Sequence, residues 1–505
     1  MEIVNHLLLS FQIALDSGNL FWCFMGCLLG TLVGVLPGLG PLASMSLLLP
    51  ISFKLSPVHS IIMLAGIYYG AAYGGSTTSI LLNIPGEACS MITCLDGYQM
   101  AKKGRAGAAL GISAIGSFIG GTFGVILITV LAPPLAGIAV KFGPPEYVSL
   151  MVLGLTFVTY LSSGSMVKAL MMTVFGLLLG CIGTDLVTGS IRFTMGLTGL
   201  SEGLDLVPVV MGLFGISEVM LNIEEKMLER EVFHTTLRGL IPNRQEFKDS
   251  AGPIARGSVM GFFLGVLPGG GAILASIVSY AMERKFSKHP ERFGTGYIAG
   301  VAGPETANNA ASQGAFIPLL SLGIPGNPVI ALLMGALIIH GVTPGPLLME
   351  THPNLFWGVV GSMYTGNVML VFLNLPLISI WVKLLRVPYV LLFPVILMLC
   401  LVGAYSINNN ILDVFIMVFF GVVGYLMKKF EYPAAPVVLA LILGPMLEKS
   451  LGQSLMMSNG SFRIFLTRPI PLTMLGITFL LLVSPLLLRL WKRRRPGLLL
   501  EGQED

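Results

Sequence analysis

Polar residues that can bind ions or carboxylates gather in three short segments of an otherwise strongly apolar chain. The first comprises 73–79 (YGGSTTS) and 83–86 (NIPG), the second spans 303–313 (GPETANNAASQ), and the third is 323–327 (GIPGN). Hydroxyl, amide and carbonyl oxygens are the ligands that small hard cations prefer. Helix amino ends freed by glycine and proline can instead hold an anion, because their N–H groups carry partial positive charge. The segments therefore indicate a site for a small cation, a carboxylate or both.

Glu305 is the only formally charged residue between Arg292 and Glu350. A charge within a membrane costs several kcal/mol, so such residues usually serve function. Glu305 can bind a cation, carry a proton or pair with the positive end of a helix, and the sequence leaves these roles open. The alternative is a glutamate at a helix start near the membrane surface. For the neutral polar residues, the alternative is that they hold neighbouring helices together.

The sequence GVLPG occurs twice, at 34–38 and at 265–269, and Ile-Pro-Gly recurs at 84–86 and 324–326. At the offset of 231 set by GVLPG, residues 76–78 align with 307–309. An insertion of nine residues then restores the Ile-Pro-Gly match. Apolar segments interrupted by glycine and proline at corresponding positions of two halves are the best sequence indication of a secondary transporter's binding site.

Composition places the chain in the membrane. It has 505 residues, of which 54% are hydrophobic and 11% charged, and its mean hydropathy is +0.85. Soluble domains carry about 25% charged residues. We therefore expect an all-α polytopic membrane protein with two inverted-topology repeats, broken helices or re-entrant hairpins, and about 11–12 crossings.

Lysine and arginine positions predict the orientation. Basic clusters lie at 102–105, 221–256, 284–292 and 492–495, whereas no basic residue precedes Lys54. Because cytoplasmic loops are enriched in basic residues, the clusters should be cytoplasmic and the N-terminus periplasmic. The first repeat then begins outside and the second inside, so the halves run antiparallel.

The same pattern predicts two hairpins and the domain boundaries. Residues 257–282 should enter the membrane and return after turning at 267–271, and 20–55 should turn at 36–40. We assign the domains as follows: 1–220, first transmembrane repeat; 221–256, cytoplasmic linker; 257–450, second transmembrane repeat; 451–505, C-terminal helix and basic cytoplasmic tail.

Several function classes are disfavoured. The chain has no GxxxxGK[ST] loop for ATP, no HExxH metalloprotease motif and no GxSxG nucleophile motif. We therefore expect no enzyme activity and no resident cofactor, with Na⁺ or H⁺ as the coupling ion. The runner-up is a passive channel or a membrane scaffold without coupled flux. Accumulation of substrate against its gradient would distinguish a coupled transporter, because a channel cannot accumulate substrate.

At these segments the chain resembles the large membrane subunit of the tripartite tricarboxylate transporter family. The resemblance rests on GVLPGLGP at 34–41, YGGSTTSILLNIPGE at 73–87, DGYQMAKKGR at 96–105, GVLPGGG at 265–271, and GPETANNAASQGAFIPLLSLGIPG at 303–326. It implies a multi-pass protein of the bacterial inner membrane that imports citrate-like tricarboxylates or other organic acids, driven by a sodium or proton gradient. It also implies two partners, a small membrane subunit and a periplasmic substrate-binding protein. A homodimer is compatible with the sequence, and no nucleic acid is expected.

The candidate site residues follow from these motifs. We expect the carboxylate substrate to be bound among Gly38, Gly40, Ser76, Thr77, Thr78, Asn83, Gly86, Gly269, Gly270, Asn308, Asn309 and Gly326. The candidate Na⁺ ligands are Ser76, Thr78, Glu305, Asn308 and Asn309.

Overall fold

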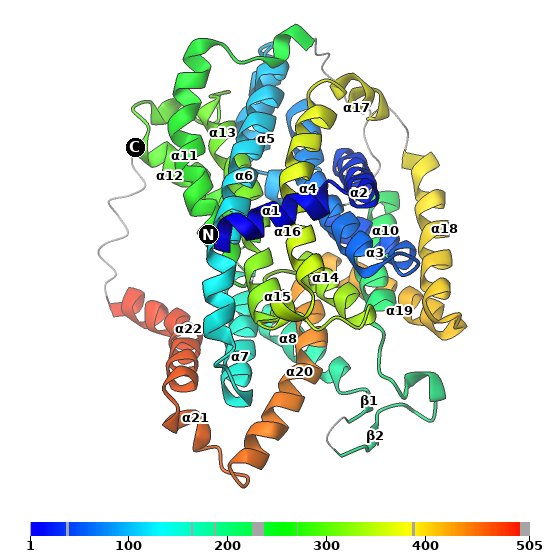
Figure 1. Cartoon of the computed structure of the whole chain (residues 1–505). Helices are drawn as coiled ribbons and strands as arrows, with labels where there is room; N and C mark the ends of the chain where they lie inside the picture. Colours follow the sequence, from blue (N-terminus) through cyan, green and yellow to red (C-terminus); the bar gives the residue numbers. More distant parts are fainter. Residues whose placement is uncertain are drawn as a thin grey trace.

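The computed structural model describes residues 2–36, 40–162, 165–185, 188–224, 237–269, 271–385 and 389–494, and these are almost entirely helical (Figure 1). Within them the strands are β1 (Gly183–Thr184) and β2 (Ile191–Arg192), which form one short antiparallel hairpin. The expected all-α polytopic membrane fold is therefore confirmed.

The helices up to residue 224 are α1 (Glu2–Ala14), α2 (Ser17–Val35), α3 (Pro41–Ser52), α4 (Pro57–Leu82), η1 (Ala88–Ser90), α5 (Thr93–Lys102), α6 (Ala106–Ala139), α7 (Pro144–Leu161), α8 (Met166–Gly180), η2 (Thr198–Leu200), α9 (Leu206–Val210), η3 (Met211–Ile216) and α10 (Ser217–Glu224). The helices after residue 236 are η4 (Leu237–Leu240), α11 (Arg244–Val266), α12 (Gly271–Phe286), η5 (Pro290–Arg292), α13 (Ala299–Gly314), η6 (Pro318–Leu322), α14 (Pro328–Ile339), α15 (Leu348–Thr351), α16 (Pro353–Asn374), α17 (Ile378–Leu384), α18 (Tyr389–Asn408), α19 (Ile411–Lys429), α20 (Ala435–Met457), α21 (Ile464–Thr467) and α22 (Pro469–Arg494).

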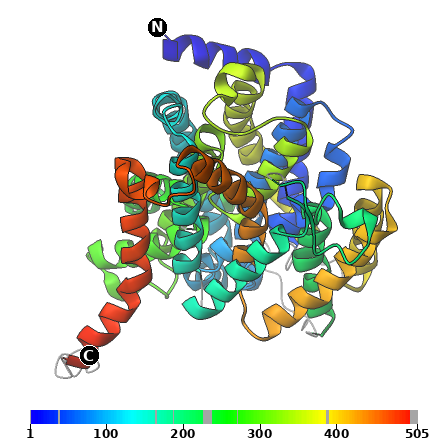
Figure 2. The ribbon, with the colours of Figure 1, turned by 90° about the horizontal axis from the view of Figure 1, so that it is seen from below.

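Among the described residues, six helices are long and apolar enough to cross a membrane: α2, α6, the continuous run of α9, η3 and α10, α16, α19 and α20. Shorter apolar helices include α3, α8 and α14. The number of crossings stays a prediction. In Figure 2, α1 lies along one edge of the bundle and α22 extends away from it at another.

Both GVLPG segments interrupt a helix, as expected. Leu36 and Leu267 end α2 and α11 in an extended conformation. That is the backbone state that a following proline imposes on the preceding residue. In the second half, α12 begins at Gly271 and packs against α11, so the two helices form a hairpin. α11 begins at Arg244, and its first turns therefore lie in the segment assigned to the linker.

In each half one long helix packs closely on another: α2 on α4 in the first half, and α11 on α13 in the second. Gly26, Gly30 and Gly34 of α2 lie against the carbonyls of Met63, Ile67 and Ala71 of α4. Gly257, Gly261 and Gly265 of α11 lie against the carbonyls of Gly303, Ala307 and Ala311 of α13. A Cβ atom on any of these glycines would approach the facing backbone to less than 3.0 Å. Glycine is therefore what allows each helix pair to approach this closely.

These contacts correct the alignment of the two halves. The glycines of α2 and α11 differ by 231 in number, but their partners in α4 and α13 differ by 240. The nine additional residues therefore precede α13, where the connection spans 287–298 against 53–56 in the first half. Residues 76–78 correspond to 316–318, not to 307–309 as the motif spacing predicted.

The helical segments that precede the two Ile-Pro-Gly motifs also end in the same way. The caps at the ends of α4 and η6 are Asn83 and Gly323, which have φ of 57° and 70°. Asparagine and glycine tolerate this left-handed conformation, which stops the helix before Ile-Pro-Gly. The pair differs by 240, in agreement with the corrected alignment.

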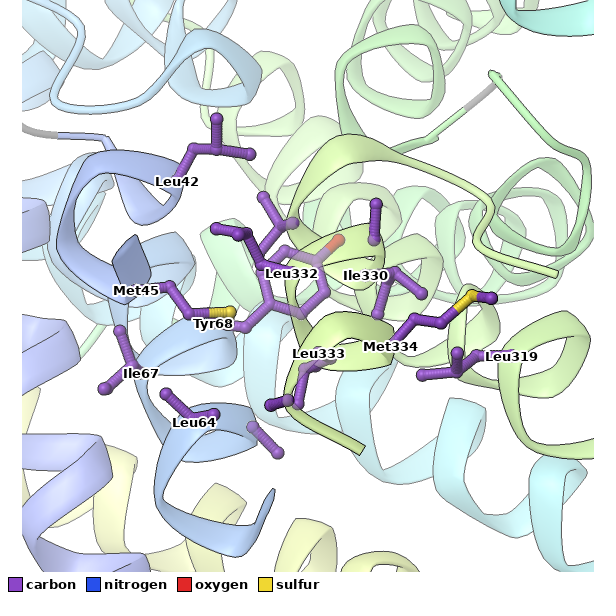
Figure 3. Close-up of a cluster of buried hydrophobic side chains, with 14 of the residues drawn as sticks. Leu42, Met45, Leu64, Ile67, Tyr68, Leu319, Ile330, Leu332, Leu333 and Met334 are labelled. Atoms are coloured by element: carbon purple, nitrogen blue, oxygen red, sulfur yellow. The ribbon is translucent and has the colours of Figure 1, made fainter. Parts of the chain in front are cut away.

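α4 and α13 are the most enclosed helices. All residues from Ser60 to Leu82 of α4, and all of α13, are buried. Around Tyr68 of α4, apolar side chains of α3, α14 and η6 belong to one cluster, and Figure 3 shows Met45 and Leu333 among them. Polar groups on these two helices must therefore find protein or water partners, since none can reach bulk solvent directly.

Candidate functional site

Glu305 lies at the place where α13 meets the first half of the chain. Its carboxylate is completely buried. Ser76 of α4 donates a hydrogen bond of 2.5 Å to Oε2, Thr93 of α5 donates to Oε1, and Asn308 Nδ2 donates to Oε2 at 3.3 Å. All these partners are neutral, and two of them come from the other half. One carboxylate therefore joins the two halves.

A second layer of polar contacts brings in α6. Asn309 Nδ2 donates to Ser117 Oγ of α6 at 2.8 Å and to Asn308 Oδ1 at 2.5 Å. Ser117 in turn donates to the backbone carbonyl of Glu305 at 3.4 Å. Residues 305, 308 and 309 share one face of α13 because they are three and four positions apart.

The arrangement suits a monovalent cation or a proton. A buried charge without an opposite charge is costly, and hydrogen bonds from neutral groups compensate it only in part. The Glu305 carboxylate accepts hydrogen bonds from two hydroxyls and one amide nitrogen, and the hydroxyl oxygens keep lone pairs that could act as hard ligands. Across the described part of the chain, no group of three or more histidine, cysteine, aspartate or glutamate residues could hold a metal ion. One carboxylate and two hydroxyl oxygens are thus the ligands that this site offers to a cation.

The structure brings together four of the five candidate cation ligands, namely Ser76, Glu305, Asn308 and Asn309. The fifth, Thr78, donates to the carbonyl of Val35 at 2.8 Å and so ties α4 to the end of α2. Thr77 is buried on α4 between Ser76 and Thr78.

A hollow opens where the start of α3 faces the chain after α4. It is lined by Gly40, Leu42, Ala43, Pro85, Gly86, Glu87, Ala88, Phe214 and Glu218. α3 begins after Gly40 without a side-chain cap, so its first N–H groups are available to an anion. Glu87 faces the same hollow, where Cys89 donates to its Oε1 at 3.0 Å. Glu218 forms an ion pair with Lys428. A carboxylate together with a cation would suit this lining.

The second hairpin tip meets its own Ile-Pro-Gly segment. The backbone N–H of Gly269 donates to the carbonyl of Gly326 at 2.7 Å. Next to this contact, Asn327 Nδ2 donates to Tyr68 Oη of α4 at 3.1 Å.

The other predicted substrate residues are placed as follows. Gly40 and Gly86 line the hollow. Asn83 is exposed and ends α4, so it terminates a helix and does not line the hollow. Gly38 and Gly270 lie outside the described residues.

Sequence reasoning missed several of these groups. Glu87 follows the NIPG motif directly, and a charged residue beside a helix break was an available signal; Thr93 lies further on, outside the motif. Ser117 shares the long apolar helix α6 with Ser113 and lies outside every motif, and Glu218 also lies far from every motif, so neither carried a signal.

Asp96, the first residue of the DGYQMAKKGR motif, holds a connection in place. Its carboxylate is buried and accepts hydrogen bonds from the backbone N–H groups of Gly294, Gly296 and Tyr297, and from the hydroxyl of Tyr280. The residues bonded through their backbone belong to the longer connection before α13. Asp96 therefore fastens that connection to α5.

Comparisons with known proteins show one family and two similar sequences. A family model described as the tripartite tricarboxylate transporter TctA family matches residues 20–439. An uncharacterized 52.8 kDa protein in the TAR-I ttuC' 3' region of Agrobacterium vitis is 50% identical over 487 residues, which make up 96% of this chain and 97% of that protein. An uncharacterized protein in the TAR-II ttuC' 3' region of the same organism is 50% identical over 227 residues, 45% of this chain and 94% of that protein. No solved structure matches the chain.

Proposed function

Because the chain belongs to the tripartite tricarboxylate transporter TctA family, we propose that it is the large subunit of an importer of tricarboxylates or related organic acids, driven by a cation gradient. Family membership makes it a membrane component of a transporter, and implies a small membrane subunit and a periplasmic substrate-binding protein as partners. The proposed location is the bacterial inner membrane, with the N-terminus periplasmic and the C-terminus cytoplasmic.

The observation that carries the proposal is the buried carboxylate of Glu305 at the junction of the two halves. A charge at such a position is stable only with a compensating cation or proton. Its hydroxyl partners come from α4 and α5, so binding of a cation would change the contacts that join the halves. A bound ion that alters the junction of two repeats is what coupled transport requires.

We assign the substrate to the hollow beside the first hairpin. The amino end of α3 would attract a carboxylate group, and Glu87 would hold a cation beside it. In this view anionic substrate and cation enter together, and Glu87 is the ligand of the cation, because Glu218 is already paired with Lys428.

The contacts between loops support the proposed orientation. Arg105 pairs with Glu246 at 2.5 Å, and Lys103 donates to the carbonyl of Thr295 at 2.5 Å. These contacts place three of the basic clusters at one end of the protein. Basic residues on one side favour the cytoplasm for that side.

Reconstitution tests the function. The chain would be placed in proteoliposomes with its small membrane subunit, and the binding protein loaded with radiolabelled citrate or another carboxylate would be added outside. An imposed inward Na⁺ or H⁺ gradient should raise the internal substrate above the external concentration. Substrate that only equilibrates would identify a passive channel and overturn the proposal. Cation-independent retention by the membrane would point to a scaffold.

A further inference from the structure

Four buried side chains near the Glu305 junction keep polar atoms without a hydrogen-bond partner among the described residues. They are Tyr73 Oη on α4, Asn309 Oδ1 and Gln313 Oε1 on α13, and both amide atoms of Asn367 on α16. None of these side chains is more than 3% exposed. A buried polar atom without a partner costs about 1–3 kcal/mol. Such a group points to water or an ion as its partner.

Glycines of α6 make the room for two of these amides. A Cβ on Gly121 would lie 2.7 Å from Asn367 Nδ2, and a Cβ on Gly124 would lie 2.7 Å from Gln313 Cβ. Gly121 follows Ser117 by four positions, so both lie on one face of α6. Asn367 therefore sits one helical turn along α6 from the Ser117–Asn309 contact.

α4 supplies a second connection to the same place. Tyr73 precedes Ser76, the donor to Glu305, by three positions and shares its face. Tyr69, one turn earlier, lies against Gly366 of α16, the neighbour of Asn367. The residues with unpartnered atoms thus lie on α4, α13 and α16, and contacts through both α6 and α4 connect Glu305 with Asn367.

The series continues away from Glu305. Tyr364 of α16 lies three positions before Asn367, and its hydroxyl is 3.1 Å from Thr129 Oγ1 of α6. Thr129 is two turns beyond Gly121 on α6. Polar groups therefore follow α6 from Ser117 to Thr129, toward the end of the helix opposite the basic cluster at 102–105.

We propose that the driving cation reaches Glu305 along a hydrated path of its own, which runs beside α6 and is lined by Asn309, Gln313, Asn367 and Tyr73. This inference rests on the proposed cation coupling. The path shares no lining residue with the hollow assigned to the carboxylate, which is formed by α3, residues 85–88, Phe214 and Glu218. Neutral amides suit such a path, because they solvate a monovalent cation without holding it strongly.

Amide substitutions test the path through the cation dependence of uptake. Asn367→Leu and Gln313→Met keep the approximate side-chain volume and remove the unpartnered atoms. In the reconstituted complex, each should raise the Na⁺ or H⁺ concentration for half-maximal uptake by about tenfold, the factor that corresponds to roughly 1.4 kcal/mol. Titrating Na⁺ at fixed pH, and pH without Na⁺, identifies the ion. The carboxylate concentration for half-maximal uptake should stay unchanged.

Asn374→Leu is the matched control. Asn374 is also buried on α16, seven positions further on; its Nδ2 donates to the carbonyl of Leu370 at 3.0 Å, and its Oδ1, like the amide of Asn367, has no partner among the described residues. The two residues therefore match in chemistry and differ in position. It lies beyond the proposed path, and its replacement should leave the cation dependence as in the wild type.

Hydroxyl-radical footprinting of the wild-type complex tests the water directly. Water beside Tyr73 should make this residue react, whereas Tyr69 should be protected, because it is buried and its hydroxyl donates to the carbonyl of Ser362. The path would be overturned if Tyr73 is not labelled and both amide variants keep the wild-type cation dependence of uptake. If uptake still follows a cation gradient, the proposed function stands. Wild-type uptake that ignores every cation gradient would overturn the proposed function and the path together.

Discussion

At the scale of single residues, the properties of Glu305 determine what the central junction can do. Its hydrogen-bond donors are neutral and come from α4, α5 and α13 itself. The corrected alignment places Ala65 at the equivalent position of α4, and Phe316 at the position equivalent to Ser76. Both are buried and apolar, so neither the carboxylate nor its donor on α4 has a counterpart at the equivalent position of the other half. A transporter with two similar halves would thus use one asymmetric ion site.

Replacing Glu305 with glutamine tests that role. Glu305→Gln keeps the shape of the side chain and removes its charge. If Glu305 binds Na⁺, uptake should need a Na⁺ concentration at least about tenfold higher, since a charge-assisted contact is worth more than 1.4 kcal/mol. If it carries a proton, uptake should lose its pH dependence. Uptake across Na⁺ concentration and pH separates the two.

Glu350→Gln, a change of the same kind in the short helix α15, serves as the control for Glu305→Gln. Its uptake should match the wild type. Wild-type transport, ion dependence and pH profile in Glu305→Gln itself would mean that Glu305 is structural.

Two neighbouring hydroxyls of α4 give a paired prediction. Ser76→Ala removes a donor to Glu305, whereas Thr78→Ala removes a bond to the Val35 carbonyl. Ser76→Ala should therefore change the cation dependence of uptake. Thr78→Ala should lower the free energy of unfolding by about 1 kcal/mol and leave that dependence unchanged. Equal effects of both changes on cation dependence would favour the original set of five ligands.

At the scale of the elements, glycine determines how closely the helix pairs approach. The glycines of α2 and α11 occur every fourth position and face backbone carbonyls of α4 and α13. Residues spaced by four lie on one face of a helix. The separation of each pair, and with it the position of Glu305 against Ser76, therefore depends on a row of residues without side chains.

Gly261→Ala tests this dependence. The added Cβ would collide with Ala307 of α13, and relieving the overlap should cost about 1–3 kcal/mol of unfolding free energy. Gly137→Ala in α6 is the control, because no atom lies within 4 Å of its Cβ position. It should be neutral or stabilising by about 0.5–1 kcal/mol. Thermal unfolding in detergent compares the two, and equal midpoints would contradict the close-packing argument.

The alignment of the two halves shows which features of the fold the sequence could predict and which it could not. GVLPG and Ile-Pro-Gly located both helix breaks and both helix ends, because proline and glycine impose their backbone states locally. Between those anchors the halves share little sequence, so the position of the nine additional residues was open. The contacts between the glycines of α2 and α11 and the carbonyls of α4 and α13 determined where these nine residues lie.

The candidate site likewise contains some residues that the sequence predicted and others that it did not. Glu305, Ser76, Asn308 and Asn309 were found because charge and clustered polarity are unusual in apolar helices. Thr78 lies two positions from Ser76, so its side chain points to another side of α4 and donates to the carbonyl of Val35; its role as a ligand stays a prediction. Ser117 and Asn367 lie outside every motif, and Tyr73 opens the segment 73–79 without a predicted role. That these three residues come near one another depends on tertiary packing.

At the scale of the whole molecule, the proposal requires the two halves to lie in the membrane with opposite orientation. The connection at 53–56 precedes α4, and its counterpart at 287–298 precedes α13. In antiparallel halves these connections must lie on opposite sides of the membrane. In parallel halves they would lie on the same side, so one measurement of sidedness separates the two arrangements.

Lys54→Cys and Lys288→Cys provide that measurement. Both lysines are exposed and each lies in the connection in question. The six native cysteines would first be replaced, and a membrane-impermeant maleimide applied to right-side-out and inside-out vesicles. The cysteine at 54 should react in right-side-out vesicles and the one at 288 in inside-out vesicles, because the basic residues around 284–292 favour the cytoplasm. Labelling of both from the same side would rule out inverted repeats, and with them the assignment of opposite sides to the two hairpins.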